Sequence, residues 1–465
     1  MPKLTFQDSY DLMLQGTLAF AQIEQNGMRL DVGYLDRMIE EVGTEIKQKE
    51  EALKEDPIWK TWTKIYGSDS NLGSGEQLGR VIFDEMKIEC KRRTATGKPA
   101  TDEDSLESVD FPFVKKWVEV GKLKRTRTTN LVGLRNEQVD GFLHPHFNLN
   151  TANSYRSSAS DPNSQNFPVR NPVLAKLVRT AFIPHEEGDV FLEIDFSGAE
   201  VRVAACYHKD PTMIDYILDK SKDMHRDMAM QCFMLEKDQM VKNIRNTAKG
   251  GFVFAEFYGD WYIQVCQNLW NSIETEKLKT AQGVGLKDHL ASKGIKSLGN
   301  LNPKVDSPGS FEEHIKEVEH DFWYNRFPVY TEWKNQLWAE YLKNGFYQML
   351  TGFIVRAVLS RNQAINYGIQ GASFHCLLWA LIQIQKWLGR RKLKSKIIGQ
   401  IHDSILLNVK RNEFDEVLYT CNRIMTKDIR ETWDWLIVPM EVEAEASDRN
   451  WFEKKSVEIP EFSVQ

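Results

Sequence analysis

Two aspartates stand where strand patterns end. The stretch QIHDSILLNV is an apolar, β-prone run broken by His402 and Asp403, and VFLEIDFSGAE carries Asp195 directly after a short apolar strand. One interpretation is purely structural: Asp195 would be a turn or capping acid, and Ser197 would be the N-cap of the next helix. Two carboxylates at neighbouring strand ends could instead hold two hard cations on oxygen ligands. Ions about 3.5–4 Å apart can activate an attacking oxygen and steady a leaving one, so the pair indicates phosphoryl transfer, by a polymerase or a nuclease.

A second set of chemically capable residues lies in RNTAKGGFVFAEFYG. Arg245 and Lys249 are four residues apart, as are Phe254 and Tyr258, so each pair shares a helical face. Cations and aromatic faces on one helix could hold a triphosphate and stack a base. His225, in the upstream run DMHR, adds a phosphate donor. Taken alone, the stretch would be interpreted as an amphipathic helix with a packed aromatic edge, so its meaning depends on the aspartates.

The bulk composition limits the classes of protein. The chain has 465 residues, 42% hydrophobic and 27% charged, which is typical of a globular protein with several structural units. Because the net charge is −6, nucleic-acid binding would depend on local basic runs at 91–93, 122–127 and 390–396, each of which alone suggests a solvated face. Six scattered cysteines favour reduced thiols in a cytoplasm. The sequence shows neither a membrane-spanning run nor a signal-peptide pattern, so no membrane partner is expected.

Periodicity outlines the elements that must position these residues. Residues 33–55 have apolar residues at helical spacing among many charges and predict a long exposed helix. Residues 281–311 are rich in Gly, Ser, Asn, Lys and Pro and predict an insertion or mobile connection. Residues 363–388 predict a buried helix entered through a glycine-containing turn. Short strands are expected on both sides of His402-Asp403, and a helix is expected to begin near Ser197.

A series of motifs follows one order along the chain. They are IEQNGMRLDVGYL, NLGSGEQLGRVIFDEM, TGKPATDEDSLESV, KLKRTRTTNLVGL, RSSASDPNSQNFPVR, IDFSGAEVR, RNTAK…FYG, INYGIQGAS, QIHDSI and VPMEVEAEASDRNW. This order resembles that of the family A DNA polymerases, the bacterial DNA polymerase I type, and points to a phage branch. IDFSGAEVR resembles motif A of the family, RNTAK…FYG motif B and QIHDSI motif C. Any one match could be chance, but the ordered set, which extends over almost the whole chain, is highly specific.

The resemblance implies an α+β right-hand polymerase fold, in which an antiparallel palm sheet carries Asp195 and Asp403. The implied parts are an N-terminal palm-base segment 1–36, a thumb 37–130, palm residues 131–212, fingers 213–350 with the insertion at about 281–311, and a C-terminal palm part 351–465.

By the same resemblance, the metal ligands would be the carboxylates of Asp195 and Asp403 and the backbone carbonyl of Phe196. The incoming nucleotide would be contacted by Arg245, Lys249, His225, Phe254, Tyr258 and Glu200. Lys249 would also act catalytically, by donating a proton to the pyrophosphate leaving group.

Three of these nucleotide contacts have particular roles in the family. Phe254 would face the sugar, Tyr258 would stack with the templating base, and Glu200 would be the steric gate against a ribose 2′-hydroxyl. The DNA would be contacted by Arg156, Asn163, Gln165, Asn166, Asn366, Gln370, His402 and Lys124. The first four would follow the minor groove, whose acceptors look alike in every Watson–Crick pair, and could test pair geometry without reading sequence. Asn366 and Gln370 would lie near the template. His402 would lie beside the primer terminus, and Lys124 would contact the DNA from the basic thumb.

Three departures from the family pattern matter. Ser404 follows the motif C aspartate where the family usually has Glu, which would alter metal preference and primer positioning. Gly198 replaces a common Gln in motif A. Motif B has one extra residue before Tyr258, which would rotate its aromatic residues by about 100° in a regular helix. A π-bulge at Gly250-Gly251 would cancel this rotation and leave Phe254, rather than its neighbour, facing the sugar.

The sequence therefore predicts a template-directed DNA polymerase that extends a DNA primer with dNTPs by two-metal phosphoryl transfer and releases pyrophosphate. The expected cofactor is Mg²⁺, as two ions, with Mn²⁺ as a substitute. One alternative is a single-subunit RNA polymerase, against which Glu200 argues. The other is a catalytically silent primer–template binding protein, against which the intact set Asp195, Asp403, Arg245 and Lys249 argues.

The expected partners are primer–template DNA, dNTPs, and a separate exonuclease or processivity subunit. The exonuclease is expected on another polypeptide because the few N-terminal acids do not form the D-x-E pattern of the family's exonuclease domain. The expected location is the cytoplasm, that of a bacterial host if the protein is phage-encoded.

Overall fold

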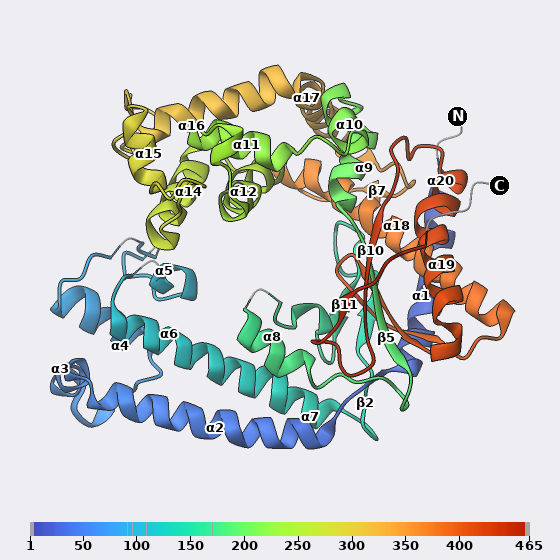
Figure 1. Ribbon diagram of the computed structural model, residues 1–465, viewed down its shortest axis with the longest axis horizontal. Helices are drawn as coiled ribbons and strands as arrows, with labels where there is room; N and C mark the ends of the chain where they lie inside the picture. The colour runs from blue at the N-terminus through green and yellow to red at the C-terminus, as the bar shows by residue number, and fades with distance from the viewer. Residues whose placement is uncertain (1–3, 91, 95, 108, 170, 461–465) are drawn as a thin grey trace.

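The computed structural model describes residues 4–90, 92–94, 96–107, 109–169 and 171–460 (Figure 1). Lys91, in the first basic run, and Arg170, at the end of RSSASDPNSQNFPVR, therefore lie outside the described residues. Two helical arms, at the bottom and the top of Figure 1, extend to the same side of a unit built around a β-sheet. This arrangement of helices and sheet confirms the α+β class.

The sheet that positions the strand-end aspartates is antiparallel, with strand order β11-β10-β5-β9-β8. Its strands are β5 (Val190–Phe196), β8 (Lys396–Ile401), β9 (Ser404–Val409), β10 (Val442–Ser447) and β11 (Lys455–Ser456). The strands expected around His402-Asp403 are confirmed as β8 and β9, which pair with each other. Strand β5 contains the expected apolar run and continues through Asp195 to Phe196, because it pairs with β9 on one side and β10 on the other.

Helices cover the sheet and connect it to the arms. They are α1 (Phe6–Asn26), α8 (Pro172–Arg179), α9 (Ala199–His208), α18 (Arg361–Arg391), α19 (Phe414–Arg423), the π-helical segment η9 (Ile424–Asp428) and α20 (Ile429–Thr432). The buried helix predicted at 363–388 is confirmed as part of α18, but the glycine turn is wrong because Gly368 and Gly371 lie within the helix. A Cβ on Gly371 would lie 2.3 Å from the backbone oxygen of Ser154, so this glycine permits close packing rather than a turn.

The lower arm in Figure 1 is helical and contains residues 37–130, for which a thumb is expected. Its elements are α2 (Val32–Glu55), α3 (Pro57–Tyr66), α4 (Gly75–Gly79), η2 (Arg80–Glu85), α5 (Glu103–Glu107), α6 (Pro112–Arg125), η3 (Thr126–Val132) and α7 (Gly133–Glu137). Helix α2 confirms the exposed helix predicted at 33–55, and Asp31 caps it by accepting a hydrogen bond from the backbone nitrogen of Tyr34 at 2.8 Å. Helices α2 and α6 lie side by side and share an apolar core that includes Leu35 and Val114.

The upper arm carries motif B. Its elements are α10 (Pro211–Leu218), α11 (Met224–Phe233), α12 (Lys242–Ala248), η6 (Lys249–Phe254), α13 (Ala255–Tyr258), α14 (Tyr262–Glu276), α15 (Leu286–Ser292), α16 (Phe311–His320), η7 (Asp321–Arg326) and α17 (Pro328–Asn344). The expectation of a loose insertion at 281–311 is wrong in part, because the segment contains α15 and buries Leu286, Leu290 and Ile295. These few apolar residues are enough to pack the segment against the arm, although glycine and polar residues dominate its composition.

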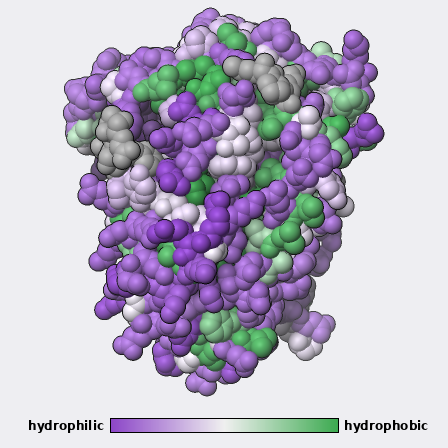
Figure 2. Space-filling view, turned by 90° about the vertical axis from the view of Figure 1, so that its right-hand side faces the viewer, coloured by the Kyte–Doolittle hydropathy of each residue, from purple (hydrophilic) through white to green (hydrophobic). Residues whose placement is uncertain are grey.

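The remaining elements are short. Three two-stranded sheets pair β1 (Met28–Arg29) with β2 (Phe142–Leu143), β3 (His146–Asn148) with β4 (Ser158–Ser160), and β6 (Tyr347–Gln348) with β7 (Ile354–Val355). The 3-10 helices are η1 (Gly67–Asp69), η4 (Ser164–Asn166), η5 (Lys237–Gln239) and η8 (Arg411–Glu413). The face on the right of Figure 1 is mostly hydrophilic, with apolar patches mainly toward its upper end (Figure 2). Within the described residues, no helix has the length and apolar character needed to cross a membrane.

Candidate active site

A two-residue turn places Asp403 at the tip of the β8–β9 hairpin. His402, the first residue of the turn, has a φ of 51°, in the left-handed region. Two side-chain hydrogen bonds brace the turn: Nε2 of Gln400 donates to the His402 carbonyl at 2.6 Å, and Oγ of Ser404 donates to the Ile401 carbonyl at 2.9 Å. Ser404, which departs from the family pattern, is therefore a buried structural residue of the hairpin.

The register between β5 and β9 brings Asp195 next to the turn that carries Asp403. Asp195 pairs with Ser404, the neighbour of Asp403, and the backbone nitrogen of Phe196 donates to the Asp403 carbonyl at 3.4 Å. On the other side of β5, Glu443 of β10 pairs with Asp195. The two aspartates thus lie at the same end of adjacent strands, with Phe196 between them and the start of α9.

Electrostatic repulsion between these carboxyls favours a bound cation. Asp195 reaches solvent, but surrounding protein removes part of its hydration; this loss, followed by the charge of Asp403, raises the pKa of Asp195 to about 7. Loss of hydration also raises the pKa of Asp403, against the opposing charge of Arg156. A divalent cation would relieve both effects, so the donor set fits Mg²⁺. In the described part of the chain, no group of three or more acidic, His or Cys side chains is arranged to hold a metal ion by itself, so a metal here would also need backbone, water or substrate oxygens.

Motif B is a single helix with a π-helical segment in its middle. Helix α12, segment η6 and helix α13 follow one another without a break, which confirms the bulge predicted at Gly250-Gly251. Val253 is fully buried, whereas Phe254 faces a cavity and lies with its ring centroid 5.3 Å from Nζ of Lys249. The bulge therefore places the aromatic ring and the cation on the same side of the helix.

The other cation of motif B is held by a residue that sequence reasoning did not assign. Nε of Arg245 donates to Oδ2 of Asp223 at 2.6 Å, and Asp223 is also the N-cap of α11. His225, two residues later, meets the edge of Phe254 with ring centroids 5.7 Å apart. Burial, followed by the charges of Lys249 and Arg245, lowers the pKa of His225 to about 4, so its imidazole is neutral at pH 7. Its Nδ1 is buried and has no hydrogen-bond partner among the described residues.

One cavity of about 550 Å³ collects most of the side chains that the sequence singled out. Its walls include Arg156, Glu200, His225, Arg245, Lys249, Phe254, Tyr258, Asn366, Gln370, His402 and Asp403. Asp195 is not part of the wall and reaches the cavity region through its strand pairing next to Asp403. Residues from motifs A, B and C, which are distant in sequence, therefore line one space that contains both cations and carboxylates.

The candidate gate is a hydrogen-bonded pair at the edge of this cavity. The hydroxyl of Tyr258 donates to Oε2 of Glu200 at 2.7 Å, and Nη1 of Arg156 lies 3.8 Å from the other carboxylate oxygen. Asn366 and Asn362 of α18 donate to the carbonyls of Tyr258 and of the next residue, at 3.0 and 2.9 Å. Asn362 was not assigned from the sequence; its i, i+4 spacing from Asn366 was the available signal.

Four predicted DNA-binding residues lie outside the cavity. Gln165 donates hydrogen bonds to polar side chains next to motif C, and Asn163 and Asn166 are exposed beside it. Lys124 lies on α6 in the lower arm, where it forms an ion pair with Glu50 of α2. The structure thus brings the first three near the hairpin and leaves Lys124 in the arm.

The start of α9 differs from the sequence-based expectation. Ser197 is not its N-cap: Gly198 is, with a φ of 63° in the left-handed region that favours glycine. The Ser197 hydroxyl instead donates to Glu443 at 3.2 Å, and the Ser197 carbonyl accepts a hydrogen bond from Nε of Arg202 at 2.9 Å. The departure from the family at Gly198 therefore accompanies a sharp turn between β5 and α9.

Comparison with solved structures relates this architecture to a known class. The polymerase domain of Pol1 from M. smegmatis, solved in complex with DNA primer-template and dNTP, superposes with a TM-score of 0.74 at 24% sequence identity, over 95% of this chain and 70% of that chain. The fold is thus that of a right-hand polymerase, with the sheet unit as the palm and the two helical arms as the thumb and the fingers.

Sequence comparison gives the family. The model of DNA polymerase family A matches residues 35–282 and 320–453, and this chain belongs to that family. DNA polymerase I of Bacillus subtilis is 25% identical over 456 residues, which cover 96% of this chain and 46% of the relative. Thermostable DNA polymerase I of Thermus thermophilus is 28% identical over 94% of this chain and 47% of the relative, and the DNA polymerase of Bacillus phage SP01 is 27% identical over 77% and 37%. The chain spans about half the length of the curated DNA polymerase I relatives it matches.

Proposed function

We propose that this chain extends the 3′ end of a DNA primer on a DNA template, using dNTPs and two divalent metal ions. The ions are Mg²⁺, for which Mn²⁺ can substitute. The observation that carries the proposal is that Asp403 of motif C lines the same cavity as Arg245 and Lys249 of motif B. Cations can bind a triphosphate at one end, while the carboxylates hold metal at the other. Membership in DNA polymerase family A supports the same activity.

Each residue has a distinct part in the proposed reaction. Bound metal ions would supply the charge that favours the attacking 3′-oxygen and the leaving pyrophosphate, and Asp195, Asp403 and the Phe196 carbonyl would hold them. The 3′-hydroxyl would lose its proton to water, its oxygen would attack the α-phosphate in line, the bond from the α-phosphorus to the oxygen bridging to the β-phosphate would break, and pyrophosphate would leave. Arg245 pairs with phosphate oxygens, and Lys249 donates a proton to the pyrophosphate.

The remaining residues would orient the nucleotide and the DNA. His225, neutral at pH 7, would donate a ring N–H to a phosphate without adding charge. Phe254 and Tyr258 would contact the sugar and the nascent base pair. The minor groove would be followed by Arg156, Asn163, Gln165 and Asn166, the template by Asn366 and Gln370, and the primer terminus by His402. Lys124 would reach a DNA phosphate by exchanging its ion pair with Glu50.

The proposal also covers the domains of the chain, its partners and its location. The palm would comprise 1–36, 131–212 and 351–465, the thumb 37–130 and the fingers 213–350. A separate exonuclease or processivity subunit would act with the chain in a bacterial cytoplasm, and the likeness to a phage polymerase supports a phage branch.

Primer extension is the direct test. Purified protein with an annealed primer–template should extend the labelled primer with dNTPs and Mg²⁺, should not extend it when the metal is chelated, and should use NTPs far less well. Mn²⁺ should restore extension after chelation. If NTPs are used as efficiently as dNTPs, the RNA polymerase alternative replaces this proposal. If primer–template binds but neither nucleotide set is incorporated, the silent-binder alternative does.

Deleting Gly251 is expected to leave measurable primer extension. The π-helical segment holds one residue more than a regular helix, so the deletion can convert it to α-helix while Phe254 and Tyr258 keep their direction. Deleting Thr247 is the matched control, because it lies between Arg245 and Lys249 where no bulge can absorb the change, and it should rotate one cation by about 100°. Single-turnover extension by both folded variants is the measurement. Equal loss in the two would show that the bulge does not absorb the deletion.

A further inference from the structure

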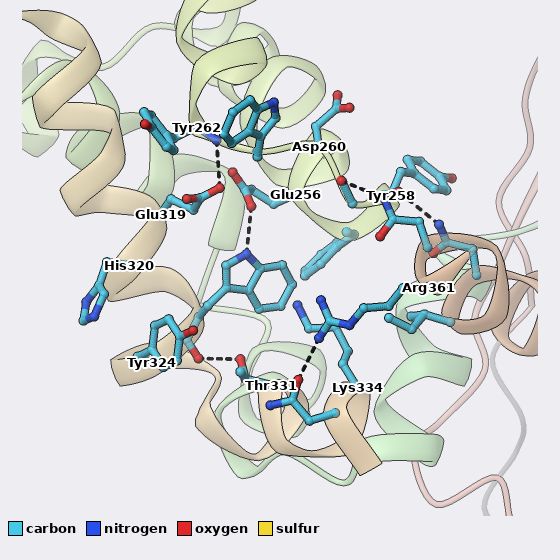
Figure 3. Close-up of a pocket in the computed structure, with 18 of the residues that line it drawn as sticks. Glu256, Tyr258, Asp260, Tyr262, Glu319, His320, Tyr324, Thr331, Lys334 and Arg361 are labelled. Carbon is cyan, nitrogen blue, oxygen red and sulfur yellow. Dashed lines mark hydrogen bonds between the residues drawn. The ribbon is translucent and has the colours of Figure 1, made fainter. Parts of the chain in front are cut away.

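A second cavity, of about 410 Å³, adjoins the candidate active site, and Phe257, Tyr258 and Asn366 line both. Three ionisable side chains from three elements meet at its inner wall: Glu256 of α13, Glu319 of α16 and Lys334 of α17 (Figure 3). Glu256 is two residues before Tyr258, so any force on this carboxyl acts directly on the end of motif B. None of the three has a part in the proposed reaction.

Glu256 is buried, with 2% of its surface exposed. Its Oε2 accepts a hydrogen bond from Nε1 of Trp323 at 2.8 Å, but its Oε1 is buried and has no donor among the described residues. The carboxyl of Glu319 lines the same cavity and is drawn next to that of Glu256 in Figure 3. Two carboxylates can bond to each other only when one of them carries a proton. The unpartnered oxygen is therefore explained if Glu256 is protonated and donates to Glu319.

The electrostatics agree with this assignment. Burial, followed by the charge of Glu319, raises the pKa of Glu256 to about 8. Glu319 is better placed to stay ionised, because its Oε1 accepts a hydrogen bond at 2.8 Å from the backbone nitrogen of Tyr262, the first residue of α14. A carboxylate is favoured at a helix N-terminus, where free backbone N–H groups point outward. The proton consequently belongs on Glu256.

Lys334 completes the cluster. Its Nζ lies 2.9 Å from the centroid of the Trp323 ring, over the face of the indole that donates to Glu256. Burial, followed by the charge of Arg361, lowers the pKa of Lys334 to about 7. The titratable or charged side chains that line the cavity around the two glutamates are Tyr258, Asp260, Tyr262, Lys316, His320, Tyr324, Lys334 and Arg361.

We propose that Glu256 and Glu319 share a proton beside Trp323 and Lys334. This shared proton fixes the C-terminal end of motif B and so positions Tyr258 at the proposed gate. Loss of the proton would leave two buried carboxylates side by side, and their repulsion would push α13 away from α16. Glu256 and Glu319 are thus positioning residues. The effect on nucleotide use rests on the proposed function, whereas the shared proton itself does not.

The sign of the pH dependence follows from the raised pKa. Unfolded Glu titrates near 4.3, so folded protein keeps a proton on Glu256 between that value and about 8 where unfolded protein does not. The stabilisation is complete below the unfolded pKa and is lost as pH rises through the folded one. Lys334, whose folded pKa is lowered, contributes with the opposite sign between about 7 and its unfolded value. Because burial lowers the pKa of Lys334 and the charge of Glu256 raises it, differences between wild type and a Glu256 variant report on Glu256 together with its effect on Lys334.

Glu256→Gln is the decisive variant, because the amide keeps the shape of a protonated carboxyl and can donate to Glu319 at every pH. Thermal unfolding of the full chain from pH 5.5 to 9.5 should show wild type losing stability relative to Glu256→Gln as pH rises to about 8. The KM for dNTP should rise several-fold in wild type between pH 7 and 9.5 and stay nearly flat in the variant. Glu332→Gln, at an exposed glutamate of α17, is the matched control and should follow wild type in both measurements.

The outcomes separate the cluster from the polymerase proposal. If Glu256→Gln and wild type lose stability in parallel across the pH range, the shared proton is refuted. If stability diverges as expected but the two KM profiles coincide, the positioning role is refuted. Absence of any polymerase activity would refute the proposed function and leave the unfolding experiment decisive for the cluster. Should Glu256→Gln fail to fold, Glu319→Gln must shift the pH dependence of wild type to lower pH, because it removes the charge that holds the proton on Glu256.

Discussion

Asp195→Ala and Asp403→Ala are each expected to lower primer extension by at least about 10²–10³-fold, the loss that follows removal of a single donor from a preorganised charged site. Each variant removes half of the carboxylate pair at the ends of β5 and β9, and the remaining half cannot hold the metal ions alone. Primer–template affinity should be little changed or slightly higher, because a negative charge is removed near a DNA surface. Single-turnover extension and DNA binding at fixed salt are the two measurements.

The control for this experiment is Asp448→Ala, at an exposed residue just beyond β10 whose partner is Arg411. It should extend primers like wild type, which would show that losing an aspartate near this sheet is harmless. Asn variants of the two aspartates should be as inactive as the Ala variants, because an amide keeps the shape but not the charge. Extension at near wild-type rate by either Ala variant would disprove the assignment of that carboxylate as a metal ligand.

The sequence predicted most reliably those features that local patterns encode. The β8–β9 hairpin follows from two apolar runs separated by two residues, which fixes both the turn and the register of the strands around His402 and Asp403. The π-bulge at Gly250-Gly251 followed from counting residues along a helix. By contrast, nothing local to Asp195 says which strand lies beside it; only the order of the family motifs placed it next to motif C.

The expectations that failed depended on neighbours distant in sequence. A glycine-containing turn was expected at the entry to the helix at 363–388, but Gly371 lies inside α18, where the backbone near Ser154 approaches closely. The segment 281–311 has a loop composition, yet Leu286 and Leu290 find an apolar surface to pack against. Ser197 has the right chemistry for a cap but donates to Glu443 of a strand that comes much later in the chain. Tertiary contacts overrode each local preference.

The buried charges beside motif B were also beyond the reach of sequence reasoning. Glu256 belongs to a stretch that was interpreted through its cations and aromatic residues, and a glutamate on the opposite face of such a helix is ordinarily exposed. Its burial depends on Trp323 and Lys334, which arrive from a different part of the fingers. The same applies to Asp223, whose ion pair with Arg245 joins two helices.

Glu200, the proposed gate residue, is placed so that the effects of its size and of its charge can be tested separately. Glu200 lies in the first turn of α9, which follows the left-handed turn at Gly198, and its carboxylate accepts a hydrogen bond from Tyr258. Loss of hydration raises the pKa of Glu200, against the effects of the Tyr258 hydroxyl and Arg156. An acid held in place by a tyrosine and an arginine at a cavity edge is better suited to filling space than to binding a proton.

Glu200→Ala is therefore expected to raise the use of ribonucleotides relative to dNTPs by about 10²-fold or more, with a smaller loss in the dNTP rate. A 2′-hydroxyl crowded against the Glu200–Tyr258 pair loses its water contacts without gaining a partner, which costs several kcal/mol, and each 1.4 kcal/mol is a factor of ten. The measurement is the ratio of kcat/KM for dCTP to that for CTP. Glu200→Gln keeps the bulk and an acceptor for the Tyr258 hydroxyl, so it should remain selective, whereas relaxed selection in this variant would assign the discrimination to charge. An unchanged ratio in Glu200→Ala would make Glu200 a structural residue of α9 and move the search for the gate to Phe254.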